Sequence, residues 1–534
     1  SKMIHGGRNP IGPEDVVTIK GRYLYQGDGE TRFFVKGIAF PIPPPFPQKI
    51  DIDGWIAVLE QLANDTDINA IRVYEMDCYH VNDTYDRFLQ RAADLGIYVI
   101  VPLTSSEGDG NLKRDMKPPS CYPRELFHYG KTCIDNYWDR PNVLMGVIGN
   151  EVMNSVTTYQ SAPCVKSYLH DLAKYSRFVA SSQLSSSRKS FPLMYATQHD
   201  SPTSELFPDE AIKLTLDYLS CSHNKKSCDD NLDLVFGINI ESWCSSSETF
   251  EVEDDGVTES SYHSLWRTFS SKNKTVKVVD SVTGKFSFEE VPPVSPSPVT
   301  VPVVFSEMGC SKRDFNNDNP LVLEDLKHIR DWKQIPLVSS EDGHMADLWS
   351  GFVAYAYDGG GVDVFRMMGD NTTKWNGKDT FHPSMEYNNF RHELSKVGNR
   401  TVMENSLPSS KTVETKEPTL PCEQAVAKIQ KYFGLKLYSL SRMPSHFHEG
   451  SSGLRTSIDM TSAYGGSHPL FSILLLVLLL VGIFLVGKNS VGRAMTRFSG
   501  FDEKIGQSKD SNDGEKSVED ETISLQSTDM NYGT

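Results

Sequence analysis

Short apolar runs of strand length recur along the first two thirds of the chain, and amphipathic stretches separate most of them. Continuous apolar strands that alternate with helices are typical of a parallel sheet covered on both faces. Eight such units favour a closed (β/α)8 barrel of TIM type, an α/β fold. An open doubly wound sheet is the alternative, but no G-x-G-x-x-G motif follows the first strand. The eight runs are Phe33–Phe40, Ala70–Met76, Ile97–Leu103, Val143–Gly149, Pro192–Gln198, Leu234–Ile240, Val301–Ser306 and Gly351–Tyr357.

The segments between these runs carry helical patterns. The clearest are Asp53–Ala63, Thr84–Leu95, Leu126–Trp138, Cys164–Ser181 and Asp209–Leu219. The last two connections are less regular, with helical pieces near Ser261–Ser270 and His344–Ser350. Residues Lys272–Thr300 look like an insertion that contains a hairpin around Thr283 and Gly284. We therefore expect one catalytic barrel over residues 1–390.

Beyond residue 390 the pattern weakens and then changes in kind. Residues 391–467 are mostly polar and are expected to form a stalk, with one amphipathic helix possible at Glu423–Phe433. Pro469–Gly487 carries no charge and is long enough to cross about 30 Å of hydrocarbon. We therefore expect a transmembrane helix over residues 468–487. A buried core helix is the alternative, but its polar, low-complexity flanks argue against it.

Three basic residues, Lys488, Arg493 and Arg497, follow the apolar segment at once. By the positive-inside rule they place residues 488–534 in the cytoplasm, as an acidic, Ser-rich and disordered tail. A lipid-anchor signal is the alternative, but such a signal ends with its apolar run. We expect a single-pass type I protein of the plasma membrane or a secretory-pathway membrane, in contact with lipid through one helix, with its barrel extracellular or lumenal.

Composition narrows the choice of partner. The formal net charge of −17 and the pI near 5.3 argue against nucleic-acid binding, which needs a basic face. An acidic protein is compatible with a neutral polysaccharide but does not identify one. The sequence opens at Ser1 without an apolar segment, as expected if a signal peptide has been removed or the sequence is incomplete.

The cysteines and glycosylation motifs favour an oxidising compartment. No C-x-x-C pair and no zinc-finger spacing occurs, so disulfides are favoured over a metal site. Cys422 is left over after eight earlier cysteines, and it is expected to be free or intermolecular. The cysteines are Cys78, Cys121, Cys133, Cys164, Cys221, Cys228, Cys244, Cys310 and Cys422. N-x-[ST] motifs, which we expect to be glycosylated, occur at Asn64, Asn82, Asn273, Asn371 and Asn399.

Two glutamates end predicted strands. Glu151 follows the fourth strand in VLMGVIGNE, and Glu307 ends the seventh in VPVVFSEMG. Catalytic groups of such barrels project from the C-terminal ends of the strands. Two carboxylates that approach to about 5 Å are what retaining glycoside chemistry requires. The alternative is that both are ordinary carboxylates at loop edges. Their matching positions at the ends of two apolar strands favour the catalytic interpretation.

Six segments together resemble a known family. IRVYEMD, GIYVIVPL, RPNVLMGVIGNEVMN, FGINIESWC, VPVVFSEMGC and MADLWSGFVAYAY resemble, in this order, the fungal glucanosyltransferases of glycoside hydrolase family 72. The resemblance spans about Val17 to Tyr357. It implies an enzyme that cuts a β-1,3-glucan chain internally and transfers the new end to another chain. No cofactor is implied.

The resemblance also implies roles for individual residues. Glu151 would be the acid/base, Glu307 the nucleophile, and Asn150 a hydrogen-bond partner of the sugar 2-hydroxyl. Substrate contacts are further expected from Tyr74, Tyr355, Tyr357, Trp243 and Glu241. For Tyr355 and Tyr357, packing in the barrel core is an equal alternative. Cys244 and Cys310 would form a disulfide beside the nucleophile.

Three positions depart from the family pattern. Ala39-Phe40-Pro41 stands where the family has Tyr-Gln-Pro, Pro102 replaces an aspartate, and Glu241 replaces a tyrosine. The catalytic pair is intact, so these changes affect the expected substrate preference more than the reaction class. The leading interpretation is a retaining β-1,3-glucanosyltransferase. The alternatives are a β-glucan hydrolase and a catalytically weak glucan-binding membrane receptor.

Overall fold

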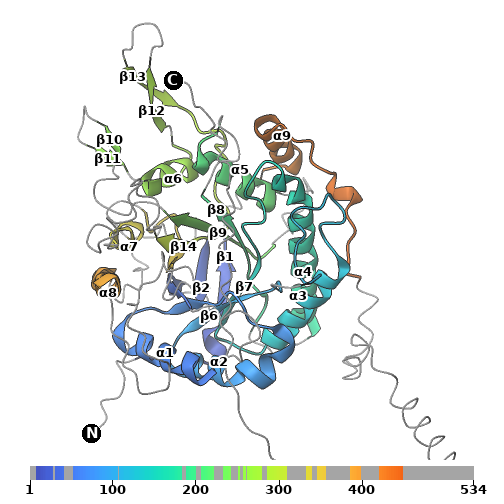
Figure 1. The fold of residues 1–534 in the computed structure, drawn as a ribbon, viewed down its shortest axis with the longest axis vertical. Coiled ribbons are helices and arrows are strands. Elements are labelled where there is room, and N and C mark those ends of the chain that lie inside the picture. Colours follow the sequence, from blue (N-terminus) through green and yellow to red (C-terminus); the bar gives the residue numbers. More distant parts are fainter. Residues whose placement is uncertain are drawn as a thin grey trace, which may run out of the picture. The chain divides into compact units, whose positions relative to one another are not determined.

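Eight parallel strands form a closed barrel in a computed structural model of the chain (Figure 1). β15 pairs with β4 and so closes the ring. Every predicted strand corresponds to one of the eight, which confirms the barrel. In chain order the strands are β4 (Val35–Ala39), β5 (Ala70–Arg72), β6 (Tyr98–Pro102), β7 (Val143–Asn150), β8 (Leu193–Gln198), β9 (Leu234–Glu241), β14 (Val303–Gly309) and β15 (Gly351–Ala354).

The structure describes sixteen stretches of the chain. They are residues 8–27, 31–40, 52–105, 108–182, 188–199, 206–221, 232–241, 250–252, 257–259, 261–272, 274–279, 286–309, 332–339, 345–355, 385–397 and 420–448.

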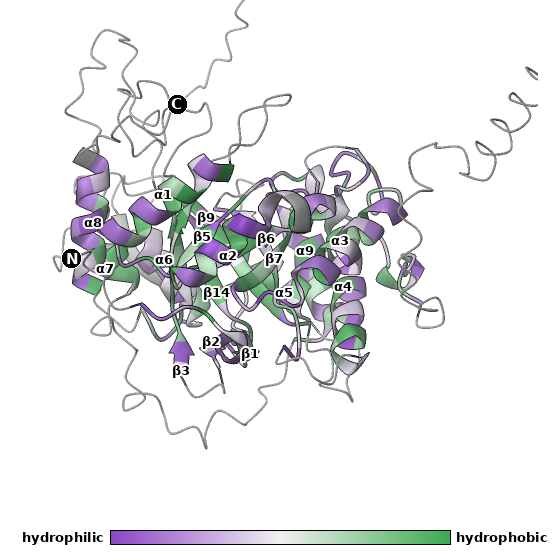
Figure 2. Ribbon diagram, turned by 90° about the horizontal axis from the view of Figure 1, so that it is seen from below, coloured by the Kyte–Doolittle hydropathy of each residue, from purple (hydrophilic) through white to green (hydrophobic). Residues whose placement is uncertain are grey.

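Helices lie outside the barrel strands, as Figure 1 shows. The amphipathic pattern explains their placement: in α2 the residues Phe88, Leu89 and Ala92 recur on one face and are fully buried. In Figure 2 hydrophobic residues gather in the strands, while polar residues are frequent on the helices. The five clearest predicted helices are confirmed as α1 (Ile52–Asp65), α2 (Asp86–Asp94), α3 (Arg124–Tyr137), α4 (Ala162–Ser182) and α5 (Pro208–Ser220).

The connections around β14 agree with the predictions only in part. The sixth predicted helix is present as α6 (Ser261–Phe269), and the predicted hairpin is formed by β12 (Lys274–Val279) and β13 (Phe286–Val291). The helix predicted at His344–Ser350 is wrong, because residues 345–350 form turns and the helix of this connection is α7 (Gln334–Val338).

A polar contact explains why residues 345–350 do not form a helix. Arg32 donates hydrogen bonds to the carbonyl oxygens of Ala346 and Trp349, and the Tyr23 hydroxyl donates to the carbonyl of Asp347. These contacts with the N-terminal segment hold residues 346–348 in a turn rather than in a regular helix. The apolar pattern of this segment therefore reflects burial under the barrel rather than helical periodicity.

Several elements were not predicted. A three-stranded antiparallel sheet of β1 (Val17–Lys20), β2 (Tyr23–Gln26) and β3 (Thr31–Phe33) precedes the barrel. The hairpin of β10 (Phe250–Val252) and β11 (Val257–Glu259) and the helix α8 (Met385–Val397) were also not predicted.

The helix predicted near Glu423 is present as α9 (Cys422–Phe433), but it is no part of a free stalk. It packs against α5 with Ala425, Ile429 and Phe433 buried, and the ring centre of Phe433 lies 4.4 Å from that of Tyr159. Cys422 forms a disulfide with Cys221, so the prediction of a free or intermolecular Cys422 is wrong. The two cysteines lie 201 positions apart, a pairing that only the fold brings together.

The segment after α9 also packs on the barrel. The carboxylate of Asp171, in α4, accepts hydrogen bonds from the Ser445 hydroxyl at 2.6 Å and the His446 backbone N–H at 2.7 Å. Residues 420–448 thus belong to the compact unit Ser1–Ser452, so the prediction that they form part of a stalk is wrong. The predicted membrane segment and tail lie outside the described residues. No helix in the described stretches is long and apolar enough to span a bilayer.

Candidate active site

Two glutamates lie at the C-terminal ends of barrel strands. Glu151 directly follows β7, and Glu307 lies in the second half of β14. Both strands break register with a neighbouring strand just before the glutamate, and bulges of this kind re-aim side chains beside active sites. Glu151 has φ 50°, in the left-handed region that residues with a Cβ rarely adopt. Such strain is concentrated at functional positions.

Glu307 is 5% exposed and is held by two donors. Arg72, the last residue of β5, forms an ion pair with it, with 3.0 Å between Nη1 and Oε1. The hydroxyl of Tyr74 donates to the same oxygen at 3.0 Å. The guanidinium of Arg72 also lies 4.5 Å from the centre of the Tyr74 ring. These contacts fix the carboxyl group at the barrel mouth in one orientation.

Arg72 connects the two sides of the site. Its Nη1 donates to the carbonyl oxygen of Ser306 at 2.8 Å, and its Nη2 donates to Oδ1 of Asn150 at 2.8 Å. Arg72 is not among the site residues predicted from the sequence. A charged residue that ends an apolar strand, two positions before Tyr74, was the available signal, and the structure shows that it is only 1% exposed.

Asn239 and Ser306, neither of which was predicted from the sequence, complete the contacts around Glu151. Asn239, in β9, donates through Nδ2 to Oδ1 of Asn150 at 3.0 Å and to Oε1 of Glu151 at 2.8 Å. The Ser306 hydroxyl donates to Oδ1 of Asn239 at 2.7 Å. Polar residues inside otherwise apolar strands were the signal that could have found them.

Burial dominates the electrostatics of Glu307. The pKa of its carboxyl is raised to about 7, because burial and then repulsion from Glu151 outweigh the opposing effects of Arg72 and Tyr74. Burial and the adjacent Glu307 also hold the pKa of Tyr74 well above its usual value, so its phenol stays a donor. Glu307 thus changes charge near neutral pH, and it is available as an anionic nucleophile from about that pH upward.

The raised pKa makes Glu307 a destabilising residue at alkaline pH. The folded-state pKa of about 7 lies above the ordinary 4.5, so the cost of ionisation is absent below pH 4.5 and grows up to pH 7. Its full size is about 3 kcal/mol. Glu307→Gln should therefore raise the free energy of unfolding at pH 8 by up to this amount and leave it unchanged at pH 4. Denaturant titrations at the two pH values measure this; a variant that is less stable than the native protein at pH 8 contradicts it.

The structure brings several of the other predicted site residues together. Asn150 and Tyr74 contact the network just described, and Tyr355 packs edge-on against Tyr74 with 6.0 Å between ring centres. Glu241 ends β9, but its side chain is outside the described part of the structure. Tyr357, Trp243, Cys244 and Cys310 also lie outside the described residues, so these assignments and the Cys244–Cys310 disulfide remain predictions.

Two of the departures from the family pattern fall on well-packed positions. Phe40 is 1% exposed, and its ring centre lies 5.5 Å from that of Trp55 and 5.4 Å from that of Phe88. The side chain of Phe40 therefore packs in the hydrophobic layer between the barrel strands and the surrounding helices. Pro102 is the buried last residue of β6.

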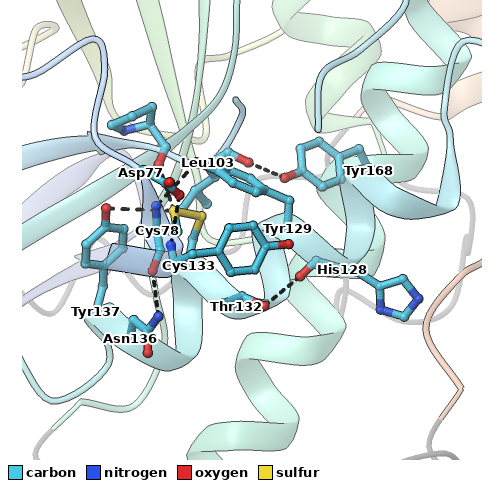
Figure 3. Close-up of a disulfide and its surroundings, with 12 residues drawn as sticks. Asp77, Cys78, Leu103, His128, Tyr129, Thr132, Cys133, Asn136, Tyr137 and Tyr168 are labelled. Atoms are coloured by element: carbon cyan, nitrogen blue, oxygen red, sulfur yellow. Dashed lines mark hydrogen bonds between the residues drawn. A yellow bond between two sulfur atoms is a disulfide. The ribbon is translucent and has the colours of Figure 1, made fainter. Parts of the chain in front are cut away.

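A disulfide anchors the loop that follows Tyr74. Cys78 is joined to Cys133 of α3, and Figure 3 shows the surrounding side chains. The side chain of Asn136 donates to the Cys78 carbonyl at 2.6 Å, and the Tyr129 hydroxyl accepts from the Cys78 backbone N–H at 3.3 Å. A second disulfide joins Cys121 to Cys164. These links hold the loops at the mouth against the helical layer.

The glycosylation motifs are described only in part. Asn64 is exposed on α1, whereas the side chain of Asn82 and all of Asn273, Asn371 and Asn399 lie outside the described residues. In the part of the chain that the structure describes, no group of three or more His, Cys, Asp or Glu side chains is arranged to hold a metal ion.

Comparison with known proteins matches the part of the chain that contains Glu151, but not Glu307, to one family. Residues 13–276 match the sequence model of the family described as Glucanosyltransferase. Protein EPD2 of Candida maltosa is 24% identical over 423 residues, which cover 75% of this chain and 60% of that protein. The 1,3-beta-glucanosyltransferase gas1 of Schizosaccharomyces pombe is 25% identical over 354 residues, which cover 64% and 50%. The chain thus spans about half to three fifths of the length of these curated relatives.

The fold is also similar to a solved structure. The apo structure of Gas2p from Saccharomyces cerevisiae superposes with a TM-score of 0.51 at 20% sequence identity, covering 77% of this chain and 70% of that one. This likeness shows a shared fold. The family match and the curated relatives confirm, over the barrel region, the resemblance predicted from the sequence motifs.

Proposed function

We propose that this chain, whose barrel resembles the glucanosyltransferase family, is a retaining β-1,3-glucanosyltransferase that cleaves and rejoins β-glucan chains. The observation that carries the proposal is the pair Glu151 and Glu307 at two strand ends, connected by a chain of hydrogen bonds through Arg72, Asn150 and Asn239. The match of residues 13–276 to the family supports the same reaction class. The acid/base role of Glu151 and the nucleophilic role of Glu307 are those that the resemblance to the family implies.

In the first half of the reaction Glu307 attacks the anomeric carbon of a bound glucan. The glycosidic bond breaks, and Glu151 delivers a proton to the leaving oxygen, so that one glucan fragment departs as an alcohol. The other fragment stays bound to Glu307 as a covalent ester. Arg72 and Tyr74 hold Oε1 of Glu307, which fixes the carboxylate that attacks.

In the second half Glu151 acts as a base. It removes a proton from a hydroxyl of an acceptor glucan, and the resulting oxygen displaces Glu307 from the anomeric carbon. Two displacements restore the original β configuration. Capture by water instead of sugar gives hydrolysis, which is the alternative function because it uses the same residues.

Product analysis tests the proposal. The full chain is incubated with reduced laminari-oligosaccharides, and the products are separated by size. Products longer than the donor support transfer, whereas shorter products alone indicate a hydrolase. If neither forms, the enzymatic proposal fails and the glucan-binding receptor becomes the better interpretation.

We also propose, from the sequence pattern, that residues 468–487 anchor the protein as a single-pass type I membrane protein with a cytoplasmic tail. The charge-free segment and the basic residues that follow it support this topology. Protease added to sealed right-side-out vesicles should digest the barrel and leave a tail epitope protected. Release of the protein by a phosphatidylinositol-specific phospholipase would contradict the proposal.

A further inference from the structure

The direction of the hydrogen bonds between the two glutamates is set by the chemistry of Arg72. A guanidinium only donates, so the Asn150 atom that it contacts must be the carbonyl oxygen Oδ1. The same oxygen contacts the side-chain amide of Asn239, so the Asn239 atom at this point must be a donor, its Nδ2. Arg72, which can only donate, therefore fixes the orientation of the side-chain amides of Asn150 and Asn239. Neither amide can be rotated to exchange its oxygen and nitrogen without losing these hydrogen bonds.

Ser306 supports this orientation from the other side. The remaining side-chain atom of Asn239 is the acceptor Oδ1, which receives the Ser306 hydroxyl at 2.7 Å. Gly237 leaves the room for that hydroxyl, because a Cβ at this position would lie 2.6 Å from Ser306 Oγ. Asn239 is 3% exposed and Ser306 is fully buried, so water competes little for these bonds.

The fixed orientation of Asn239 determines which oxygen of Glu151 can carry a proton. The Nδ2 group of Asn239 also donates to Oε1 of Glu151, at 2.8 Å. In a carboxylic acid the carbonyl oxygen is a much better acceptor than the hydroxyl oxygen, so the oxygen that accepts this bond is the carbonyl oxygen. The proton of the acid form therefore belongs on the other oxygen, Oε2.

We propose that Asn239 is a positioning residue that keeps Oε1 of Glu151 occupied, so that Oε2 gives and takes the catalytic proton, and that Ser306 locks Asn239 in this role. The inference rests on the proposed function and adds the atom through which the proton moves. In the first half-reaction the Oε2–H bond breaks and the proton goes to the leaving oxygen. In the second, Oε2 takes the proton of the acceptor hydroxyl. In each ionised state Asn239 stabilises the negative charge through Oε1.

Asn239→Asp tests the proposal, because it keeps the shape of the side chain and replaces the donor by an acceptor. The full chain is assayed with two donors: a reduced laminari-oligosaccharide, whose leaving group needs a proton, and a β-laminaribiosyl fluoride, whose leaving group needs little protonation. General acid catalysis contributes about 10²–10⁴-fold. We expect kcat/KM for the oligosaccharide to fall by at least about 100-fold. First-turnover fluoride release, which bypasses the acid, should fall by less than about tenfold.

A matched control separates positioning from folding. Asn142 is also buried, at 2% exposed, and donates to the Leu89 carbonyl away from the site, so Asn142→Asp makes the same chemical change elsewhere. In Asn142→Asp the rate with the oligosaccharide and the rate with the fluoride should change by the same factor. Ser306→Ala should shift activity in the same direction as Asn239→Asp but by only about tenfold, since one neutral hydrogen bond is lost.

The outcomes are distinct. A loss in Asn239→Asp that is equal for the two donors, with the native protein active on both, overturns the role of Asn239 and leaves the proposed function standing. Turnover of neither donor by the native protein overturns the proposed function, and this inference with it. A selective loss with the oligosaccharide, absent in Asn142→Asp, supports the assignment of the proton to Oε2.

Discussion

Glu307→Gln is expected to lower the turnover of laminari-oligosaccharides by at least about 10⁴-fold, because removal of a nucleophile eliminates the covalent route. The amide keeps the shape of the side chain, and its oxygen can still accept from Arg72 and Tyr74. The fold should therefore remain, and above pH 7 it should become more stable. Steady-state rates measured on the full chain, together with circular dichroism, test both halves of this expectation.

A second buried carboxyl provides the control. Glu386 is 4% exposed and lies in α8, outside the barrel strands that form the site. Glu386→Gln should keep its rate within about threefold, since substitutions away from the chemistry have little effect on the transition state. Residual activity of Glu307→Gln above about 1% of the native rate would remove Glu307 from the role of nucleophile.

Glu151→Gln should impair catalysis at a different step from Glu307→Gln. It removes the proton donor, so oligosaccharide turnover should fall by about 10²–10⁴-fold, but Glu307 can still attack a donor with a good leaving group. An activated fluoride donor should therefore still label Glu307 covalently. Peptide mapping that finds the label on another carboxyl would reverse or break the assignment of the two glutamates.

The barrel could be predicted because its strands are buried on both faces and read as unbroken apolar runs. β7, VLMGVIGN, is buried at every position but the last. The N-terminal sheet could not be predicted in the same way, because β1 is only four residues long and ends in an exposed lysine, Lys20. The failed helix at His344–Ser350 shows a further limit: its carbonyls are bonded to Arg32 and Tyr23, more than 300 positions away in the sequence.

The site was predictable only where its chemistry coincides with a strand end. Glu151 and Glu307 stood out because each interrupts an apolar run at its C-terminal end. Arg72, Asn239 and Ser306 carry the network between them, but each is a single polar residue of an apolar strand, and Arg72 gave no clear signal even though it ends β5. Their partners lie on other strands of the closed barrel, so only the register of that barrel reveals what they contact.

Cysteine pairing was the least predictable feature, and one pair should have a large effect on stability. Replacing both Cys221 and Cys422 by serine removes a covalent link across 201 positions. The loop-entropy relation for that length gives a loss of about 5 kcal/mol in the free energy of unfolding. The same relation gives about 4 kcal/mol for the pair Cys121 and Cys164, which is separated by 43 positions. Denaturant unfolding of the two double variants compares these losses.

Loss of the Cys221–Cys422 disulfide should leave the geometry of the catalytic site unchanged. Cys221 directly follows α5, and a helix that returns from β8 to β9 ends at the face of the barrel opposite the strand ends that carry the glutamates. The buried ammonium of Lys166 contacts the carbonyls of Tyr218 and Cys221, and it keeps these partners when the sulfurs are replaced. We therefore expect the double variant to lose stability and to release α9 to proteases, while its kcat below the unfolding transition stays within about twofold. The double variant could instead fold with an unchanged free energy of unfolding, or with a selectively lowered kcat. Either result would contradict the role of this disulfide in holding α9 on the barrel domain.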